Sequence, residues 1–164
     1  MIADDHEIVR LGIRSLLEAT GRYEMVASVA NGEAARDAVF ETTAPLVVLD
    51  SDMPGLDPFC ASAEIKRRLP ATGIVFFAHA VQDGAIDAAM RAGASAFVAK
   101  ADSASDLVTA LDSVREGKTH FSPIVSRRVD ARSDRSAEHV SRVNLLTGRE
   151  REVLVHIAKG YSKK

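Results

Sequence analysis

The feature that most limits the fold of this chain is the alternation of short apolar segments with segments of helical spacing. The apolar segments have the length and the branched and aromatic content of buried strands. Alternating strands and helices form a parallel sheet with helices on both faces, so we expect an α/β fold. The apolar start Met1–Ala3 fits a first strand. The predicted strands that follow it are Met25–Val29, Leu46–Leu49, Ile74–Phe77 and Ala96–Ala99.

Local signals mark where the intervening helices begin. Apolar residues between Val9 and Leu17 recur at the spacing of one helical face. Asn31 and Asp57 are residues of the type that caps a helix at its amino end, and Pro58 suits the first turn. The other helices are predicted over residues 31–41, 57–68, 83–93 and 103–116.

Composition excludes several classes of protein. The 164 residues are enough for one domain of ordinary size and a fragment of another. The net charge of −2 gives no general attraction to nucleic acid, so any contact with DNA must come from a local patch. The single cysteine, Cys60, suits a reducing compartment, and we expect it to be a small buried side chain. No apolar run reaches the roughly 18 residues of a membrane span, and no export signal opens the chain.

The sequence changes character after residue 121. Residues 122–143 are charged and nearly free of large apolar side chains, which is typical of a linker, either irregular or partly helical. Thr147 and Glu150 then form the T-x-x-E pattern of a helix start. The predicted organisation is a domain over residues 1–121, a linker over 122–143, and the start of a helical domain over 144–164.

Charged side chains follow three of the predicted strands at the point where each strand ends. Asp4 and Asp5 follow the first strand, Asp50 and Asp52 the third, and Lys100 the last. The carboxyl ends of parallel strands share one edge of the sheet, where ligand sites lie. Clustered carboxylates repel one another, and a hard divalent cation relieves this, Mg²⁺ being favoured where phosphate is handled. A nucleophilic carboxylate, Mg²⁺ and a lysine are the parts that aspartyl-phosphate chemistry needs.

Each of these residues alone has an ordinary structural explanation. An aspartate after a strand commonly caps the next helix, and Lys100 alone would be a solvated strand end. A functional site is favoured because all of these residues lie at strand ends within one series of alternating strands and helices. His6 has no second histidine at ligand spacing, so we expect it at the surface or outside the ligands of the metal.

Four stretches of the chain, ADDHEIVR, VLDSDMPG, RAGASAFVAK and LTGREREVLVHIAKGYS, occur in this order. Together they resemble a two-component response regulator of the NarL/FixJ type. The resemblance implies a flavodoxin-like (βα)5 receiver with a five-stranded parallel sheet, then the first part of a LuxR-type helix-turn-helix. It implies a cytoplasmic transcription regulator that a sensor histidine kinase phosphorylates, and that then forms a homodimer and binds DNA as the full-length protein. No catalysis is implied beyond self-phosphorylation and autodephosphorylation.

The resemblance also implies roles for the charged residues. Asp50 would accept the phosphoryl group, and Lys100 would pair with that group. Mg²⁺ would be bound by the side chains of Asp5 and Asp50, by the backbone carbonyl of Asp52, and through water by Asp4. The side chain of Asp52 is then expected to face solvent.

Two further positions bear on the function, and two alternative functions stay open. Phe97 stands at the switch aromatic position of the family, although core packing explains a phenylalanine there equally well. Ala78 stands where the family has Ser or Thr, and alanine has no hydroxyl to donate to a phosphoryl group. One alternative is therefore a degenerate receiver that binds partners without phosphorylation. The other is a haloacid-dehalogenase-type phosphatase, which shares D-x-D, but Pro54 stands where that motif has Thr or Val.

Overall fold

The computed structural model describes residues 1–132, so the predicted helix-turn-helix start at 144–164 lies outside the described residues. Met1–Ser126 form one compact unit, and Arg127–Lys164 belong to a second. A helix over residues 123–132 lies inside the predicted linker. The elements before it are β1 Ile2–Ala3, α1 Glu7–Ala19, β2 Ser28–Val29, α2 Gly32–Thr42, β3 Leu46–Asp50, α3 Pro58–Arg68, β4 Gly73–Ala78, α4 Asp83–Arg91, β5 Ala96–Ala99, α5 Ala104–Arg115 and β6 His120–Phe121.

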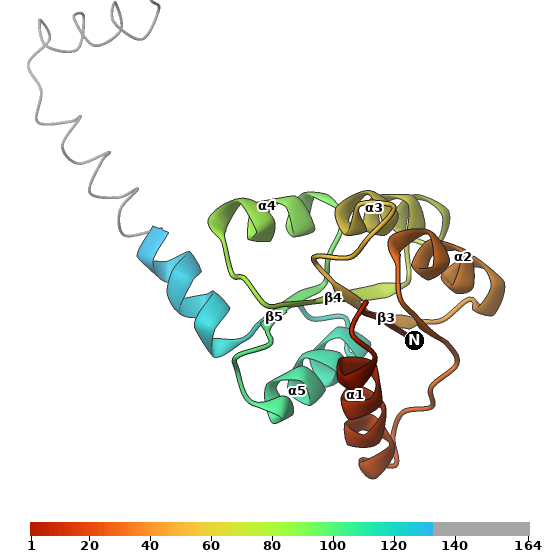
Figure 1. The fold of residues 1–164 in the computed structure, drawn as a ribbon. Helices are drawn as coiled ribbons and strands as arrows, with labels where there is room; N and C mark the ends of the chain where they lie inside the picture. The colour runs from red at the N-terminus through yellow and green to blue at the C-terminus, as the bar shows by residue number, and fades with distance from the viewer. Residues whose placement is uncertain (133–164) are drawn as a thin grey trace, which may run out of the picture. The chain divides into compact units, whose positions relative to one another are not determined.

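The strands form one parallel sheet in the order β2-β1-β3-β4-β5-β6. Helices α2, α3 and α4 cover one face of this sheet, and α1 and α5 cover the other (Figure 1). This confirms the predicted α/β fold. Among residues 1–132, no helix is both long enough and apolar enough to cross a membrane.

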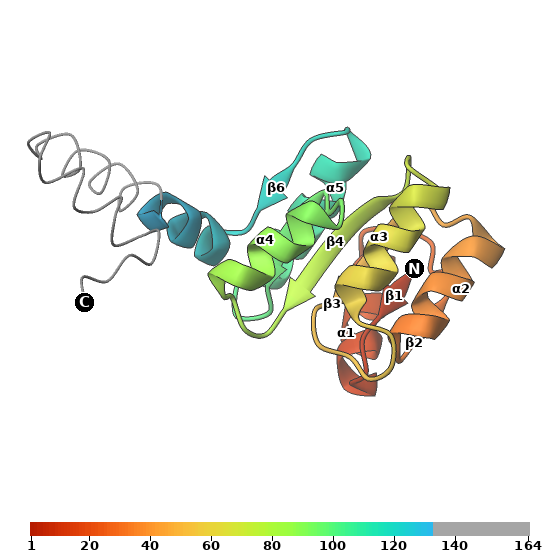
Figure 2. The same ribbon diagram turned by 90° about the horizontal axis from the view of Figure 1, so that it is seen from above.

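The prediction was wrong for the two outermost strands of the sheet, β2 and β6, which Figure 2 shows from above. The sheet has six strands in place of the five expected, because the two residues of β6 pair with β5. Two residues are too few to give a strand pattern in the sequence. At the other edge, only Ser28–Val29 of the predicted Met25–Val29 strand is strand, because its partner β1 offers two residues for pairing.

The central strands β3, β4 and β5 are buried almost along their whole length. Val48, Val75 and Val98 belong to the core that packs against α1 and α5. Phe76 faces the other layer, where its ring stacks on Phe59 of α3 with centroids 5.0 Å apart. Burial on both faces explains why these strands appear in the sequence as unbroken apolar runs.

The helix starts confirm the predicted caps. The side chain of Asn31 accepts a hydrogen bond from the backbone N–H of Ala34 at 2.8 Å, and Asp57 accepts one from Cys60 at 2.9 Å. Cys60 itself contradicts its prediction, because it is exposed. The buried residues of α3 are on another face of the helix, at Pro58, Ala61, Ser62 and Ile65.

Met1 lies at the amino ends of the strands, beside a cavity of about 510 Å³. The residue is only 8% exposed, and its ammonium group donates a hydrogen bond to the carbonyl of Leu46 at 2.7 Å. Burial lowers the pKa of this amine from 8.0 to about 6. In a polypeptide that begins at Met1, burial therefore disfavours the charged form of this amine.

This burial predicts a pH dependence of stability. Between pH 6 and pH 8 the unfolded chain holds a proton on the amine that the folded chain does not hold. Raising the pH through this range should therefore increase the free energy of unfolding, by up to about 2.7 kcal/mol. Urea titrations across the range measure the increase, and chain acetylated at its amino end is the control. Identical pH profiles for the two forms would contradict the prediction.

Candidate functional site

The site lies at the edge of the sheet where β1, β3, β4 and β5 end. Asp4 directly follows β1, Asp50 is the last residue of β3, and Lys100 directly follows β5. Ala78 is the last residue of β4, between the strands that carry Asp50 and Lys100. The parallel arrangement therefore brings residues far apart in the sequence to one edge, as predicted from the strand ends.

Lys100 bridges the two buried carboxylates of the site. Its Nζ atom lies 2.7 Å from Oδ2 of Asp4 and 2.8 Å from Oδ2 of Asp50. These aspartates are only 1% and 3% exposed. The ring of Phe77 lies beside the same ammonium group, with its centroid 5.7 Å from Nζ. Buried charges are costly unless they are paired, so the ammonium group keeps both carboxylates in place.

The surroundings raise the pKa values of both Asp50 and Lys100, for different reasons. Burial raises the pKa of Asp50, and the hydrogen bond from Lys100 offsets only part of that rise. The backbone N–H of Asp52 also donates to the Asp50 carboxylate, which favours its charged form. Burial alone would lower the pKa of Lys100, but the bonds and charges of Asp4 and Asp50 outweigh burial and raise it. Lys100 is therefore a cation at neutral pH.

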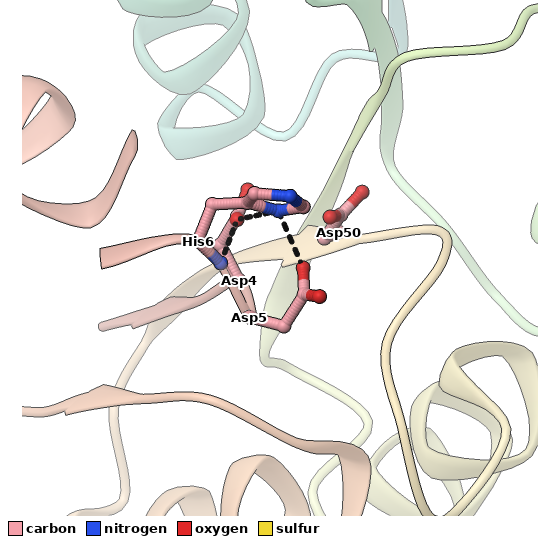
Figure 3. Close-up of side chains that lie close together, drawn as sticks. All are labelled: Asp4, Asp5, His6 and Asp50. Carbon is pink, nitrogen blue, oxygen red and sulfur yellow. Dashed lines mark hydrogen bonds and ion pairs between the residues drawn. The ribbon is translucent and has the colours of Figure 1, made fainter. Parts of the chain in front are cut away.

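Asp5 and His6 are the more exposed members of the cluster, and Figure 3 shows the ring of His6 beside Asp4 and Asp5. Nδ1 of His6 lies 2.7 Å from Oδ1 of Asp5 and 3.5 Å from Oδ1 of Asp4. The backbone N–H of His6 also donates to Oδ1 of Asp4, at 2.9 Å. The imidazole is 66% exposed, in agreement with its predicted place at the surface. Its contact with both acids was not predicted, since sequence spacing alone carries no signal for it.

The donor atoms fit a small divalent cation. Asp4, Asp5, His6 and Asp50 each offer one ligand atom, and these atoms all lie within 4.8 Å of one another. Three of these four groups are carboxylates. In the described part of the chain, the ammonium group of Lys100 bonds to two of them. A cluster of oxygen donors with an excess of negative charge is the type of site that Mg²⁺ takes in proteins.

Comparison with known proteins decides against one of the functions that the sequence left open. Residues 1–112 match the response regulator receiver domain. The chain belongs to the response regulator family. This membership decides against the haloacid-dehalogenase-type phosphatase.

Individual relatives agree with this assignment. The chain is 35% identical to the response regulator protein VraR of Staphylococcus epidermidis over 99% of its own length and 76% of the relative. A LuxR-family response regulator from Aurantimonas sp. SI85-9A1 has a TM-score of 0.78 at 32% identity, over 81% of this chain and 95% of that one. RcsB of Salmonella typhimurium has a TM-score of 0.79 at 27% identity, over 98% of this chain and 77% of that one.

The loop of this response regulator that follows Asp50 is packed against the start of α2. Gly55 has a φ of 83°, and a Cβ atom at this position would collide with the carboxylate of Glu33. That carboxylate accepts a hydrogen bond from the backbone N–H of Leu56, which lowers the pKa of Glu33. Asp52, in the same loop, is exposed, as expected of its side chain. Its role as a ligand through the backbone carbonyl stays a prediction.

Ala78 and Phe97 are both fully buried, at 0% exposure. The carbonyl of Ala78 accepts a hydrogen bond from the backbone N–H of Lys100 at 2.7 Å, so the main chain of this position does contact the site. The ring of Phe97 stacks on Phe76 with centroids 6.1 Å apart. In this structure Phe97 is therefore a core residue, and its role as a switch stays a prediction.

Proposed function

We propose that Asp50 of this response regulator accepts a phosphoryl group from a sensor histidine kinase in the cytoplasm. Asp4, Asp5 and Asp50 would hold Mg²⁺, with the backbone carbonyl of Asp52. The observation that carries the proposal is the Lys100 ammonium group, which lies within 2.8 Å of the Asp50 carboxylate at the open edge of the sheet. The short distance between a carboxylate nucleophile and a cation supports this proposal, because phosphoryl transfer needs both groups at one point.

The chemistry is a transfer of one phosphoryl group between two nucleophiles. A carboxylate oxygen of Asp50 forms a bond to phosphorus while the bond from phosphorus to the donor nitrogen breaks, and that nitrogen keeps the electron pair. Mg²⁺, when bound, supplies positive charge to the phosphoryl oxygens. Lys100 supplies a second positive charge to the same oxygens, and the N–H of Asp52 orients the carboxylate of Asp50.

Intact-mass measurement of the whole chain tests this proposal. Incubation with acetyl phosphate and Mg²⁺ should give one phosphoryl adduct per chain, and incubation with acetyl phosphate and a chelator should give none. The absence of an adduct in the presence of Mg²⁺ would contradict the proposal and favour the degenerate receiver, which binds partners without phosphorylation.

Ala78 gives a second prediction, which concerns the strength of the response. A threonine at this position would offer a hydroxyl donor to the phosphoryl group, and a bond to a charged group contributes roughly 1.5–3 kcal/mol. Ala78→Thr should therefore strengthen phosphorylation-linked dimerisation about tenfold or more. Analytical ultracentrifugation with and without the phosphodonor measures this.

The matched control is Ala78→Val, which adds nearly the same volume at this fully buried position but no hydroxyl. Valine should leave the response unchanged or weaken it. Equal responses in the wild type and in Ala78→Thr would show that the missing hydroxyl does not limit the switch.

The proposed downstream partners are a second copy of the chain and, for the full-length protein, DNA. RcsB, to which the chain is similar, has been solved as dimers bound to DNA. Ile8 and Leu11 lie one turn apart on α1 and are 77% and 51% exposed, so they form an apolar surface that a subunit contact would cover. Light scattering with and without the phosphodonor tests whether the dimer forms.

A further inference from the structure

Ser122 connects the segment after β6 to the strand end that carries Lys100. The residue is 0% exposed, and its hydroxyl oxygen accepts a hydrogen bond from the backbone N–H of Ala99 at 3.0 Å. Its own backbone N–H donates to the carbonyl of Phe97 at 3.1 Å. Ala99 directly precedes Lys100, so Ser122 fixes the main chain next to the cation of the site.

Asp102 makes a second connection, to the helix over residues 123–132. Its carboxylate accepts a hydrogen bond from the backbone N–H of Ile124 at 3.1 Å. The N–H groups of the first turn have no partner within their own helix, so Asp102 acts as a cap supplied by another element. Val125, next in this turn, is 0% exposed, and Ser126 donates to the carbonyl of Phe121 at 3.1 Å.

The four residues from Ala99 to Asp102 therefore have the site on one side and the helix start on the other. The backbone N–H of Lys100 donates to the carbonyl of Ala78 at 2.7 Å, and that of Asp102 donates to the carbonyl of Ala99 at 3.0 Å. Because the main chain of residues 99–102 is held at each of these points, one of its residues cannot easily move without the others. A displacement of the main chain at Lys100 is therefore transmitted to Ser122 and Asp102 unless one of these bonds breaks.

We propose that Ser122 and Asp102 couple the phosphorylation site to the helix over residues 123–132. This inference rests on the proposed function, because the displacement arises when Lys100 leaves Asp4 to bond to a phosphoryl group on Asp50. The route runs through the main chain of residues 99–102, so it needs no hydroxyl at Ala78. Coupling is reciprocal, so loss of the helix cap must in turn change the affinity of the site for a phosphoryl mimic.

Amide hydrogen exchange of the whole chain tests the coupling, with Mg²⁺ and beryllofluoride as the phosphoryl mimic. In the wild type, the mimic should change the exchange rates of residues 123–132 by threefold or more. Asp102→Ala should remove this change, and Ser122→Ala should reduce it. Asp102→Asn should preserve it, because the amide oxygen of asparagine also accepts the Ile124 N–H. Asp102→Ala should also shift the affinity for the mimic at least twofold.

The matched control is Asp106→Ala, which removes another carboxylate cap, the bond from the Ser103 N–H at 3.0 Å. This variant should keep the response of residues 123–132. If the mimic binds the wild type but leaves those rates unchanged, or if Asp102→Ala responds like the wild type, the coupling is wrong while the acceptor chemistry stands. If the mimic does not bind at all, the proposed function and the coupling are both wrong.

Discussion

Asp50→Asn should abolish the phosphoryl adduct that the wild-type chain forms with acetyl phosphate and Mg²⁺. The substitution keeps the shape of the side chain but replaces a carboxylate oxygen with a neutral amide, which is too weak a nucleophile to attack phosphorus. It also removes one negative charge from the cluster of acidic side chains that could bind a cation. Intact-mass spectra of the two proteins, recorded under identical conditions, measure the loss.

Asp52→Asn is the matched control for this result. Asp52 lies two residues away and is exposed, and its expected contributions come from its backbone. The variant should therefore still form the adduct. An adduct that survived Asp50→Asn would place the acceptor on another residue, and an adduct lost in both variants would point to a disturbed loop.

Lys100→Met should strongly lower the free energy of unfolding of the chain when no metal ion is bound. The substitution keeps most of the apolar stem but removes the charge that holds Asp4 and Asp50, which are almost completely buried. Breaking a buried pair in this way leaves uncompensated charge, so the free energy of unfolding should fall by about 3–5 kcal/mol. Urea titrations at neutral pH in the presence of a chelator measure this change.

Two comparisons separate lost charge from lost packing. Lys118→Met removes an exposed ammonium group that lies 2.7 Å from Glu116, and such a pair contributes little, so stability should not change measurably. Adding Asp50→Asn to Lys100→Met removes one of the two carboxylates left unpaired, so it should restore part of the lost stability. A Lys100→Met protein as stable as the wild type would show that the carboxylates do not depend on Lys100.

The sequence predicted the parts of the fold that depend on local pattern. The strands β3, β4 and β5 and the caps at Asn31 and Asp57 all follow from apolar runs or from capping chemistry. The length of β2 and the existence of β6 did not follow, because the pairing of an outer strand depends on its neighbour. Exposure of Cys60 was missed because a short polarisable side chain suits either face of a helix.

The convergence of Asp4, Asp50 and Lys100 was predictable from the sequence, but their contacts and the place of His6 in the cluster were not. Asp4, Asp50 and Lys100 follow from one rule, that parallel strands end at the same edge. Which carboxylates share the ammonium group depends on side-chain geometry, and so does the pairing of His6 with Asp5. The cap from Asp102 joins residues 22 positions apart in the sequence, and no local pattern marks such a pair.

The bridge made by Lys100 has a consequence for how the chain would acquire the proposed metal ion. An internal cation already pairs with both buried carboxylates and offsets one of their two negative charges, so the sheet can close around them before an ion binds. Folding and metal loading are then separate events, unlike in small domains that remain unfolded until their metal arrives. An incoming ion must compete with the ammonium group for Asp4 and Asp50, which weakens its binding. Occupancy of the site should therefore follow the concentration of Mg²⁺ around a chain that is already folded.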